Sequence, residues 1–257
     1  MQAILDVKDL SKTYIVKKRQ NNVLRNVSFS VLPGEMVAIM GPSGSGKSTL
    51  LYTVSGMDPL TAGSVHFMGD DISAVTGNRM ADIRLNRMGF IFQQMYMMKN
   101  LSIYDNIILP AYESKEVRGK AARRAKNEYA KELMRKMEII DVAENDINEV
   151  SGGQLQRACI CRCLINEPDI IFADEPTGSL NKQASADVMD EILRVNREGT
   201  AVLLVTHNVR VAAKCERVLY ITDGRISGEY GCGKYEGEQT LRDRERVLNN
   251  WLLVRGW

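Results

Sequence analysis

The chain has 257 residues, which is long for one domain and short for two, so we expect one large domain with a sub-lobe. Its 34 basic and 32 acidic residues leave a net charge of +2, which argues against a protein built to neutralise nucleic-acid phosphates. The longest apolar runs, such as Ala201–Val205, are far below the roughly 18 residues needed to cross a bilayer, and no apolar stretch follows Met1. The sequence therefore predicts a cytoplasmic protein with no nucleic-acid partner.

The chain opens with strand patterns and then alternates strands with helices. Strands are predicted where apolar residues alternate or run together, at 3–10, 23–31, 36–40, 64–68, 89–92, 169–173, 200–205, 217–221 and 225–229. Helices are predicted at 50–55, 154–165 and 182–196. Strands that alternate with helices imply an α/β fold with a mostly parallel core sheet covered by helices.

Two segments depart from this alternation. From about residue 95 to 150 the sequence is helical and charged, which predicts a helical sub-lobe inserted into the sheet domain. A tail over 231–257 follows the main domain of residues 1–230, and an amphipathic helix is expected over 239–254 with Leu248 and Trp251 on its apolar stripe. The tail could dock onto a partner, but we expect it to pack on the surface of its own domain.

A glycine-rich loop follows the strand at 36–40 and leads into a helix. Its spacing, Gly-x4-Gly-Lys-Ser, and its context match the P-loop. Glycines let successive backbone N–H groups face one centre, and the following helix adds its positive end, so the loop predicts a phosphate site. Lys47 is placed to reach the β and γ phosphates of ATP, and the Ser48 hydroxyl to bind Mg²⁺. The candidate ATP-binding residues of this loop are Gly41, Pro42, Ser43, Gly44, Ser45, Gly46, Lys47, Ser48 and Thr49.

Two carboxylates follow the apolar strand at 169–173. Asp174 is expected at the carboxyl edge of the sheet, where parallel sheets bind ligands, and can hold Mg²⁺ directly or through a water. Glu175 projects one residue further and is a candidate general base for attack of water on the γ-phosphate. Acidic residues at a strand end can instead cap the next helix. The P-loop earlier in the chain favours the catalytic interpretation.

A second glycine motif, Ser151-Gly152-Gly153-Gln154, precedes the acidic strand, and with it the chain from about residue 5 to 230 resembles the ATP-binding-cassette (ABC) ATPases. The motif matches the signature sequence of that family, except that Val150 stands where leucine is usual. The resemblance implies a P-loop NTPase fold with an antiparallel β sub-lobe and the inserted helical sub-lobe. At a helix N-terminus the motif would form a second anion site. The resemblance also implies that two copies pair head to tail, each signature sequence covering the ATP held by the other copy's P-loop.

Other positions take a role only through this resemblance. Gln93 is similar to the glutamine that touches Mg²⁺ and the attacking water, and His207 to the switch histidine that contacts the γ-phosphate. Tyr14 resembles the aromatic residue that stacks on adenine; alternatively it is a half-buried strand tyrosine. Asn181 stands where the family commonly has Asp, in the loop Ser179-Leu180-Asn181 that joins the subunits. The expected catalytic residues are Lys47, Gln93, Glu175 and His207, and the expected metal ligands are Ser48, Gln93 and Asp174.

The resemblance also indicates a class of transporter. Lys47 and Ser151 are only 104 residues apart and the chain has one cassette, unlike the chromosome-maintenance and translation-factor members. Residues 89–94, 106–110 and 173–181 look most like the class that serves lipoprotein release, macrolide export and peptide-antibiotic resistance. The implied protein is an ATP-hydrolysing subunit on the inner face of the cell membrane that powers a separate permease. The alternative is a soluble, non-transport ABC ATPase with a regulatory role.

The permease contact is expected near residues 93–106. Met95, Met97 and Met98 together with Tyr96 offer a soft apolar surface for a partner helix, or else these methionines fill the core of the sub-lobe. The basic segment 115–136 could face anionic lipid, although we favour a solvated helix face with ion pairs.

Overall fold

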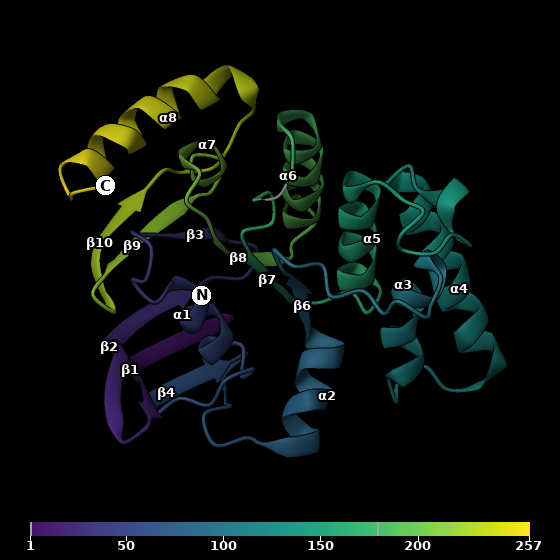
Figure 1. Cartoon of the computed structure of the whole chain (residues 1–257), viewed down its shortest axis with the longest axis horizontal. Coiled ribbons are helices and arrows are strands. Elements are labelled where there is room, and N and C mark those ends of the chain that lie inside the picture. The colour runs from purple at the N-terminus through teal and green to yellow at the C-terminus, as the bar shows by residue number, and fades with distance from the viewer. Residues whose placement is uncertain (1, 179) are drawn as a thin grey trace.

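The computed structural model describes residues 2–178 and 180–257, so Ser179 of the expected subunit-joining loop lies outside the described residues (Figure 1). A six-stranded sheet runs through the centre in the order β10-β9-β3-β8-β7-β6. Its strands are β3 (Met36–Met40), β6 (Met88–Ile91), β7 (Ile170–Asp174), β8 (Ala201–Val205), β9 (Arg217–Thr222) and β10 (Arg225–Gly231). Neighbouring strands are parallel except β10, which is antiparallel to β9. The predicted α/β fold with a mostly parallel core sheet is confirmed.

A smaller antiparallel sheet in the order β2-β1-β4-β5 forms the expected β sub-lobe. Its strands are β1 (Leu5–Val16), β2 (Arg19–Val31), β4 (Ala62–Phe67) and β5 (Asp70–Asp71). β1 and β2 extend well beyond the predicted strands and meet at a two-residue turn, Lys17-Lys18, in which both residues have positive φ, 48° and 67°. Such turns usually use Asn-Gly, so the two lysines carry no hairpin signal in the sequence.

Helices cover both faces of the core sheet and build a separate lobe. They are α1 (Lys47–Val54), α2 (Gly77–Arg87), α3 (Ile103–Glu113), α4 (Gly119–Lys136), α5 (Gly152–Leu164), α6 (Lys182–Arg197), α7 (Val209–Ala212) and α8 (Glu238–Leu253), with a 3₁₀ turn at Ile140–Val142. The sequence pattern does not predict α2 or α7. α2 buries only Met80 and so lacks an apolar stripe, and α7 is a single turn.

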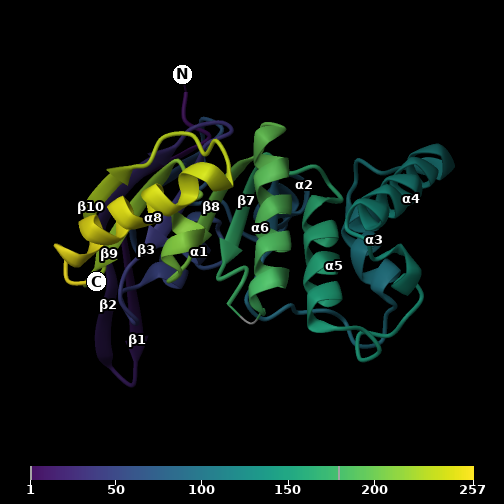
Figure 2. The same cartoon turned by 90° about the horizontal axis from the view of Figure 1, so that it is seen from above.

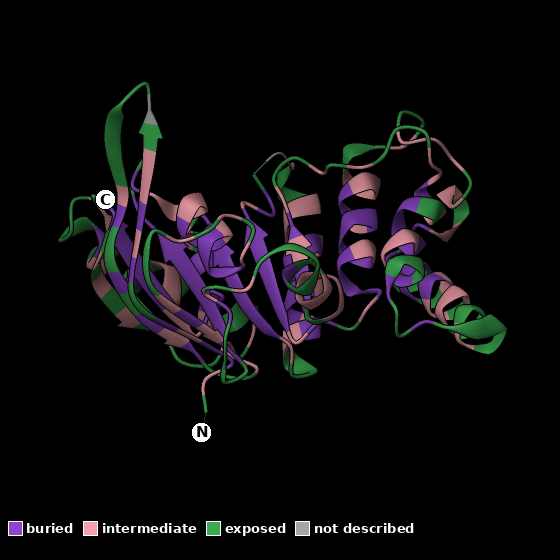
Figure 3. Ribbon diagram, turned by 90° about the horizontal axis from the view of Figure 1, so that it is seen from below, coloured by how far each residue is buried: buried purple, intermediate pink, exposed green. Residues whose placement is uncertain are grey.

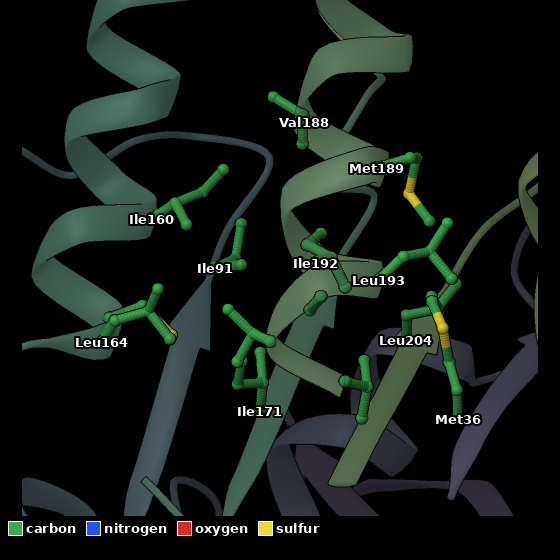
Figure 4. Close-up of a cluster of buried hydrophobic side chains, with 14 of the residues drawn as sticks. Met36, Ile91, Ile160, Leu164, Ile171, Val188, Met189, Ile192, Leu193 and Leu204 are labelled. Atoms are coloured by element: carbon green, nitrogen blue, oxygen red, sulfur yellow. The ribbon is translucent and has the colours of Figure 1, made fainter. Parts of the chain in front are cut away.

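The main core lies between the central sheet and the helices α5 and α6 (Figure 4). Ile91, Ile171 and Leu204 project from three of the strands toward Ile160 of α5 and Ile192 of α6. On the opposite face, α1 and the antiparallel sheet bury a second cluster. The inner strands β3, β7 and β8 are therefore buried along their whole length, as Figure 3 shows, which explains their unbroken apolar sequences, whereas the edge strand β10 has no buried residue. Their carboxyl ends carry the loops of the candidate site.

The helical sub-lobe is built mainly from α3, α4 and the adjoining α5, which pack against one another. Lys126 pairs with Glu167 at 2.7 Å, and Lys136 pairs with Glu132 one turn away at 2.8 Å. These contacts favour a solvated, ion-paired face for the basic segment. Met97 packs against the core, whereas Tyr96 and Met98 are 64% and 50% exposed. The segment after β6 therefore does both: Met97 contributes to the core, and Tyr96 and Met98 form an exposed apolar surface.

The tail packs on its own domain. α8 lies along α7, and Trp251 packs its ring against Tyr220 and Tyr230 at centroid distances of 6.2 and 5.4 Å. The guanidinium of Arg244 donates hydrogen bonds of 2.7 to 3.1 Å to five backbone carbonyls, those of Ala213, Cys215, Cys232, Gly233 and Lys234. We propose the same division as before, with residues 1–230 as the main domain and 231–257 as the tail.

The Arg244→Ala variant is expected to lower the free energy of unfolding of the tail by about 2–3 kcal/mol, because it removes charge-assisted bonds to several carbonyls at once. Trp251 and Trp257 are the only tryptophans, so their fluorescence in a urea titration reports the tail. The fluorescence midpoint should shift more than the far-ultraviolet circular dichroism midpoint. Arg242→Ala, an exposed arginine on the same helix, is the matched control; equal shifts for the two variants would contradict the anchoring role of Arg244.

Candidate functional site

The loop between β3 and α1 has the backbone that a phosphate cradle requires. Gly44 and Gly46 have positive φ, 77° and 100°, and a Cβ on Gly41 would lie 2.1 Å from the carbonyl oxygen of Ile221. The first N–H groups of α1 have no acceptor within the helix and point toward this loop. Ser45 Oγ is buried and has no hydrogen-bond partner among the described atoms. A phosphate oxygen is the kind of acceptor that such a donor and such N–H groups would satisfy.

Lys47 folds back across the loop. Its Nζ donates hydrogen bonds of 2.9 Å to the carbonyl oxygens of Gly41 and Pro42. Partial burial lowers the pKa of the Lys47 ammonium, and the negative charges of Glu175 and Asp174 act against this shift. The amine therefore lies within the electrostatic reach of both carboxylates and inside the loop that would hold phosphate.

Ser48 and Asp174 meet although they are 126 positions apart. Ser48 Oγ donates to Asp174 Oδ1 at 2.9 Å, and Tyr52 OH donates to Asp174 Oδ2 at 2.7 Å. Burial raises the pKa of Tyr52, with a further contribution from Asp174, so the phenol keeps its proton and remains a donor. Tyr52 is a site residue that sequence reasoning missed, although it lies four positions after Ser48 and hence on the same face of α1.

Glu175 follows Asp174 in a strained conformation. It has a positive φ of 48°, unusual for a residue with a side chain, and two backbone bonds hold it there: its N–H donates to Val205 O and its carbonyl accepts from Gly178 N–H, both at 3.0 Å. This turn aims the carboxylate at His207, whose Nδ1 lies 2.8 Å from Glu175 Oε1. The two residues end neighbouring parallel strands, β7 and β8, which is why the fold brings them together.

Gln93 lies beside the same loop. A Cβ built on Gly178 would lie 3.3 Å from Gln93 Nε2, so the amide contacts the turn that follows Glu175. Beyond Gln93 the chain is tied to the helical lobe, because Arg162 of α5 donates to the carbonyl oxygens of Met95 and Tyr96 at 2.7 and 2.8 Å. Gln93 is therefore at the junction between the carboxylates and the lobe.

Tyr14 lies at the edge of the P-loop region on β1. Its hydroxyl donates to Asp58 Oδ2, and the ammonium of Lys12 lies 4.6 Å from its ring centroid and 2.6 Å from Asp58 Oδ1. Burial, with a further contribution from Asp58, raises the pKa of the Tyr14 phenol. Lys12 and Asp58 thus hold the Tyr14 ring in position. No motif in the sequence predicts this triad.

The signature residues cap a helix away from the P-loop. Ser151 is the N-cap of α5: its Oγ accepts a bond from Gln154 N–H at 3.3 Å, while its own N–H donates to Gln154 Oε1 at 2.9 Å. Gly152 and Gly153 begin the helix, and a Cβ on Gly152 would meet no atom within 4 Å. In both Figure 1 and Figure 2, α5 lies on the other side of β7 from α1. The two candidate anion sites are therefore separate within one chain.

Asn181 begins α6. Its side-chain oxygen accepts a hydrogen bond of 2.9 Å from Ala184 N–H, the N-cap contact that an aspartate would also make. The missing negative charge therefore leaves the cap intact.

The donor set fits a magnesium–nucleotide complex. The Ser48 hydroxyl and the Asp174 carboxylate are adjacent hard oxygen donors of the kind that Mg²⁺ prefers, and the loop supplies the N–H groups and the lysine that phosphates require. The structure thus brings together Lys47, Ser48, Gln93, Asp174, Glu175 and His207, while Ser151, Gly152, Gly153 and Gln154 stand apart from them.

The comparisons agree with this geometry. The sequence matches the ABC transporter family over residues 24–178, more than half of the chain. The chain belongs to this family. The bacitracin export ATP-binding protein BceA of Halalkalibacterium halodurans is 37% identical over 240 residues, which cover 93% of this chain and 92% of BceA. The macrolide export ATP-binding/permease protein MacB of Shigella flexneri is 37% identical over 227 residues, 88% of this chain but only 34% of MacB.

Solved structures of ABC cassettes have the same fold. The ATP-binding cassette MJ0796, in a dimeric post-hydrolysis state bound to ADP and Pi, superposes with a TM-score of 0.81 at 33% identity, covering 89% of this chain and 98% of MJ0796. The family and the fold class expected from the motifs are confirmed. Among the helices of the described residues, each is too short or too polar to span a bilayer.

Proposed function

We propose that this ABC protein is the ATP-binding and ATP-hydrolysing subunit of a transporter and that it powers a separate membrane permease. The observation that carries the proposal is the convergence, at the carboxyl ends of three parallel strands, of a P-loop, the Ser48–Asp174 pair and the Glu175–His207 pair. Strand-end sites of this kind bind ligands in open α/β sheets. The related export proteins give no support to the regulatory alternative.

In this proposal the P-loop holds ATP. The N–H groups of the loop and of the first turn of α1 would receive the phosphates, and Lys47 would exchange the carbonyls of Gly41 and Pro42 for phosphate oxygens. Thr49, which follows Ser48 in the first turn of α1, would belong to the same phosphate-binding loop. The ring of Tyr14 would stack on the adenine base of ATP. Mg²⁺, when bound, would neutralise phosphate charge in the transition state. Ser48 and Asp174 would hold it, with Gln93 as a further candidate ligand at the edge of the site.

Hydrolysis would depend on Glu175. Its carboxylate can take a proton from the attacking water, since its strained turn places it at the strand end just beyond Asp174. His207 is more exposed than Glu175, with 67% against 14% of its side chain accessible, and its ring can exchange the carboxylate for the γ-phosphate. His207 would then orient Glu175 before ATP binds and sense the phosphate afterwards.

The second anion site calls for a second copy. Ser151 and the first N–H groups of α5 form a helix N-terminus that no phosphate of the same chain's P-loop can reach, because α5 and α1 lie on opposite sides of β7. Two copies arranged head to tail would place each signature sequence over the other copy's P-loop. ATP would then bind the copies together, and hydrolysis would separate them. The dimeric structures of MJ0796 support the pairing of two copies.

The permease contact is proposed at a groove next to residues 93–106. The groove, of about 310 Å³, lies between α2, α3, α5 and β6 and includes apolar Leu85 and Phe90 together with Arg84. Arg162 forms part of the groove and also holds the segment that exposes Tyr96 and Met98. A short amphipathic helix of a permease fits such a surface. Binding there would place the chain on the cytoplasmic face of the membrane.

The names of the related proteins indicate the class of permease. BceA and MacB are named as export proteins for bacitracin and macrolides, and we propose the same class here, in which the permease meets an antibiotic or a lipoprotein outside the cytoplasm. The cargo contacts would belong to the permease.

The Ala81→Arg variant tests the function and the groove together. Ala81 is exposed on α2 and lines the groove, so an arginine side chain would fill it without disturbing the core. When the chain is co-expressed with its permease and extracted in detergent, co-purification should fall at least about tenfold. Ala121→Arg, on an exposed face of α4, is the matched control. Failure of the parent chain to co-purify would reject the transporter function, and equal recovery of both variants would reject the groove.

A further inference from the structure

The tip of the β1–β2 hairpin is strongly basic. From residue 10 to 34 the chain has no acidic residue and five basic ones, three of which, Lys17, Lys18 and Arg19, are consecutive at the turn. All three side chains are exposed. The positive φ of Lys17 and Lys18 holds them at the very end of a tight turn. The hairpin therefore presents a compact positive charge away from the body of the domain.

An acidic loop precedes the signature sequence. Residues 141–150 contain four acidic residues, Asp141, Glu144, Asp146 and Glu149, and no basic one. Two backbone bonds fix this loop to the start of α3, from Ile103 N–H to Asn145 O at 3.0 Å and from Tyr104 N–H to Ala143 O at 2.8 Å. Glu144 and Glu149 are exposed. The loop is thus a rigid negative surface immediately before Ser151.

Neither surface is neutralised by an ion pair in the part of the chain that the structure describes. Among the described residues, no ion pair joins Lys17, Lys18, Arg19, Glu144 or Glu149 to any other side chain. Figure 2 shows why they cannot meet internally: the hairpin and the loop leading into α5 project from the same side of the molecule, the side on which β7 ends, but at opposite ends of it.

We propose that the basic tip of one copy contacts the acidic loop of a second copy and that this contact sets the register of the head-to-tail dimer. The inference rests on the proposed function, because it needs that dimer. Tyr14, the candidate base-stacking residue, lies on β1 just before the tip, and Ser151 just after the acidic loop. When Ser151 of one copy covers the P-loop of the other, the segments adjoining these two residues come to the same end of the interface.

Two properties of the contact follow from symmetry and exposure. A two-fold axis produces the contact twice, so each charge change counts twice in the dimer. Exposed charges are screened by salt, with a Debye length of about 10 Å at 0.1 M, so the contact should strengthen dimer assembly at low ionic strength and steer the approach of the two copies.

The test is a charge swap within one chain, made in the hydrolysis-deficient Glu175→Gln background. Dimerisation in Mg-ATP is measured by sedimentation velocity over a range of protein concentrations, at about 50 mM and about 500 mM NaCl. Lys17→Glu with Lys18→Glu should raise the dimer Kd by about tenfold at low salt. Glu144→Lys, which breaks no hydrogen bond of the loop, should weaken the dimer in the same direction. The three changes together should recover most of the loss, because the reversed tip then meets a reversed loop.

The outcomes separate this inference from the dimer itself. Lys120→Glu with Arg124→Glu on exposed α4 makes the same change in net charge and should leave the dimer Kd within about twofold. A Glu175→Gln parent that stays monomeric in Mg-ATP would refute the ATP-driven dimer of the proposed function. A parent that dimerises while the tip variant dimerises equally well, or while the triple variant shows no recovery, would overturn the contact alone. A tip variant that keeps the dimer but loses binding to phosphatidylglycerol vesicles would assign the basic tip to lipid instead.

Discussion

Glu175→Gln is expected to lower the rate of ATP hydrolysis by at least about a hundredfold while ATP still binds. The amide has the shape of the carboxylate but cannot accept a proton from water. It can still interact with His207, 2.8 Å away in the parent, and the backbone bonds that hold the turn to Val205 and Gly178 do not involve the side chain. The loss should therefore appear in kcat and leave the affinity for ATP almost unchanged.

Phosphate release at saturating Mg-ATP measures the rate, and sedimentation in the same buffer shows whether the variant accumulates as an ATP-bound dimer. Glu116→Gln, an exposed glutamate outside the ion-pair set of the described residues, is the matched control and should hydrolyse ATP like the parent. Parental turnover in Glu175→Gln would remove Glu175 from the role of base. A slow variant that never dimerises would keep the base but contradict closure of two copies over ATP.

The parts of the site that the sequence predicted are those written in consecutive residues. The P-loop, the Asp174–Glu175 pair and the signature are each a short motif next to a strand or helix whose apolar pattern is clear. Parallel strands end at one edge of the sheet, so recognising β3 and β7 was enough to expect Ser48 near Asp174, and the structure places these side chains 2.9 Å apart. Local chemistry and sheet topology explain this success.

The parts that the sequence did not predict depend on contacts between distant segments. Lys12, Tyr14 and Asp58 form one triad without a shared motif. Lys12 and Tyr14 are two positions apart on β1, and Asp58 follows them by at least 44 positions. The Lys17-Lys18 turn carries no glycine or asparagine, and its positive φ values are maintained by the long β1–β2 ladder rather than by its own residues. Tertiary pairing overrides local preference there. The roles assigned to Tyr14, Gln93 and the signature residues stay predictions.

Lys47→Ala is the second change with a large expected effect, and it acts on binding. The lysine is the only side chain in the loop from Gly41 to Thr49 that carries a positive charge, and a hydrogen bond to a charged group is worth about 1.5–3 kcal/mol, so ATP affinity should fall by tens to about a hundredfold. Burial already lowers the pKa of this amine, and its hydrogen bonds go to carbonyls that loop water can satisfy. The fold should therefore tolerate the change.

Isothermal titration with Mg-ATP gives the affinity, and urea unfolding shows whether stability is kept. Lys120→Ala removes an equal charge from exposed α4 and should bind ATP like the parent. A general loss of positive charge would weaken both variants alike, and this effect disappears at high salt, whereas a direct contact in a partly buried loop is screened much less. Normal affinity in Lys47→Ala, or a loss shared with Lys120→Ala, would therefore refute the assignment of this loop as the phosphate site.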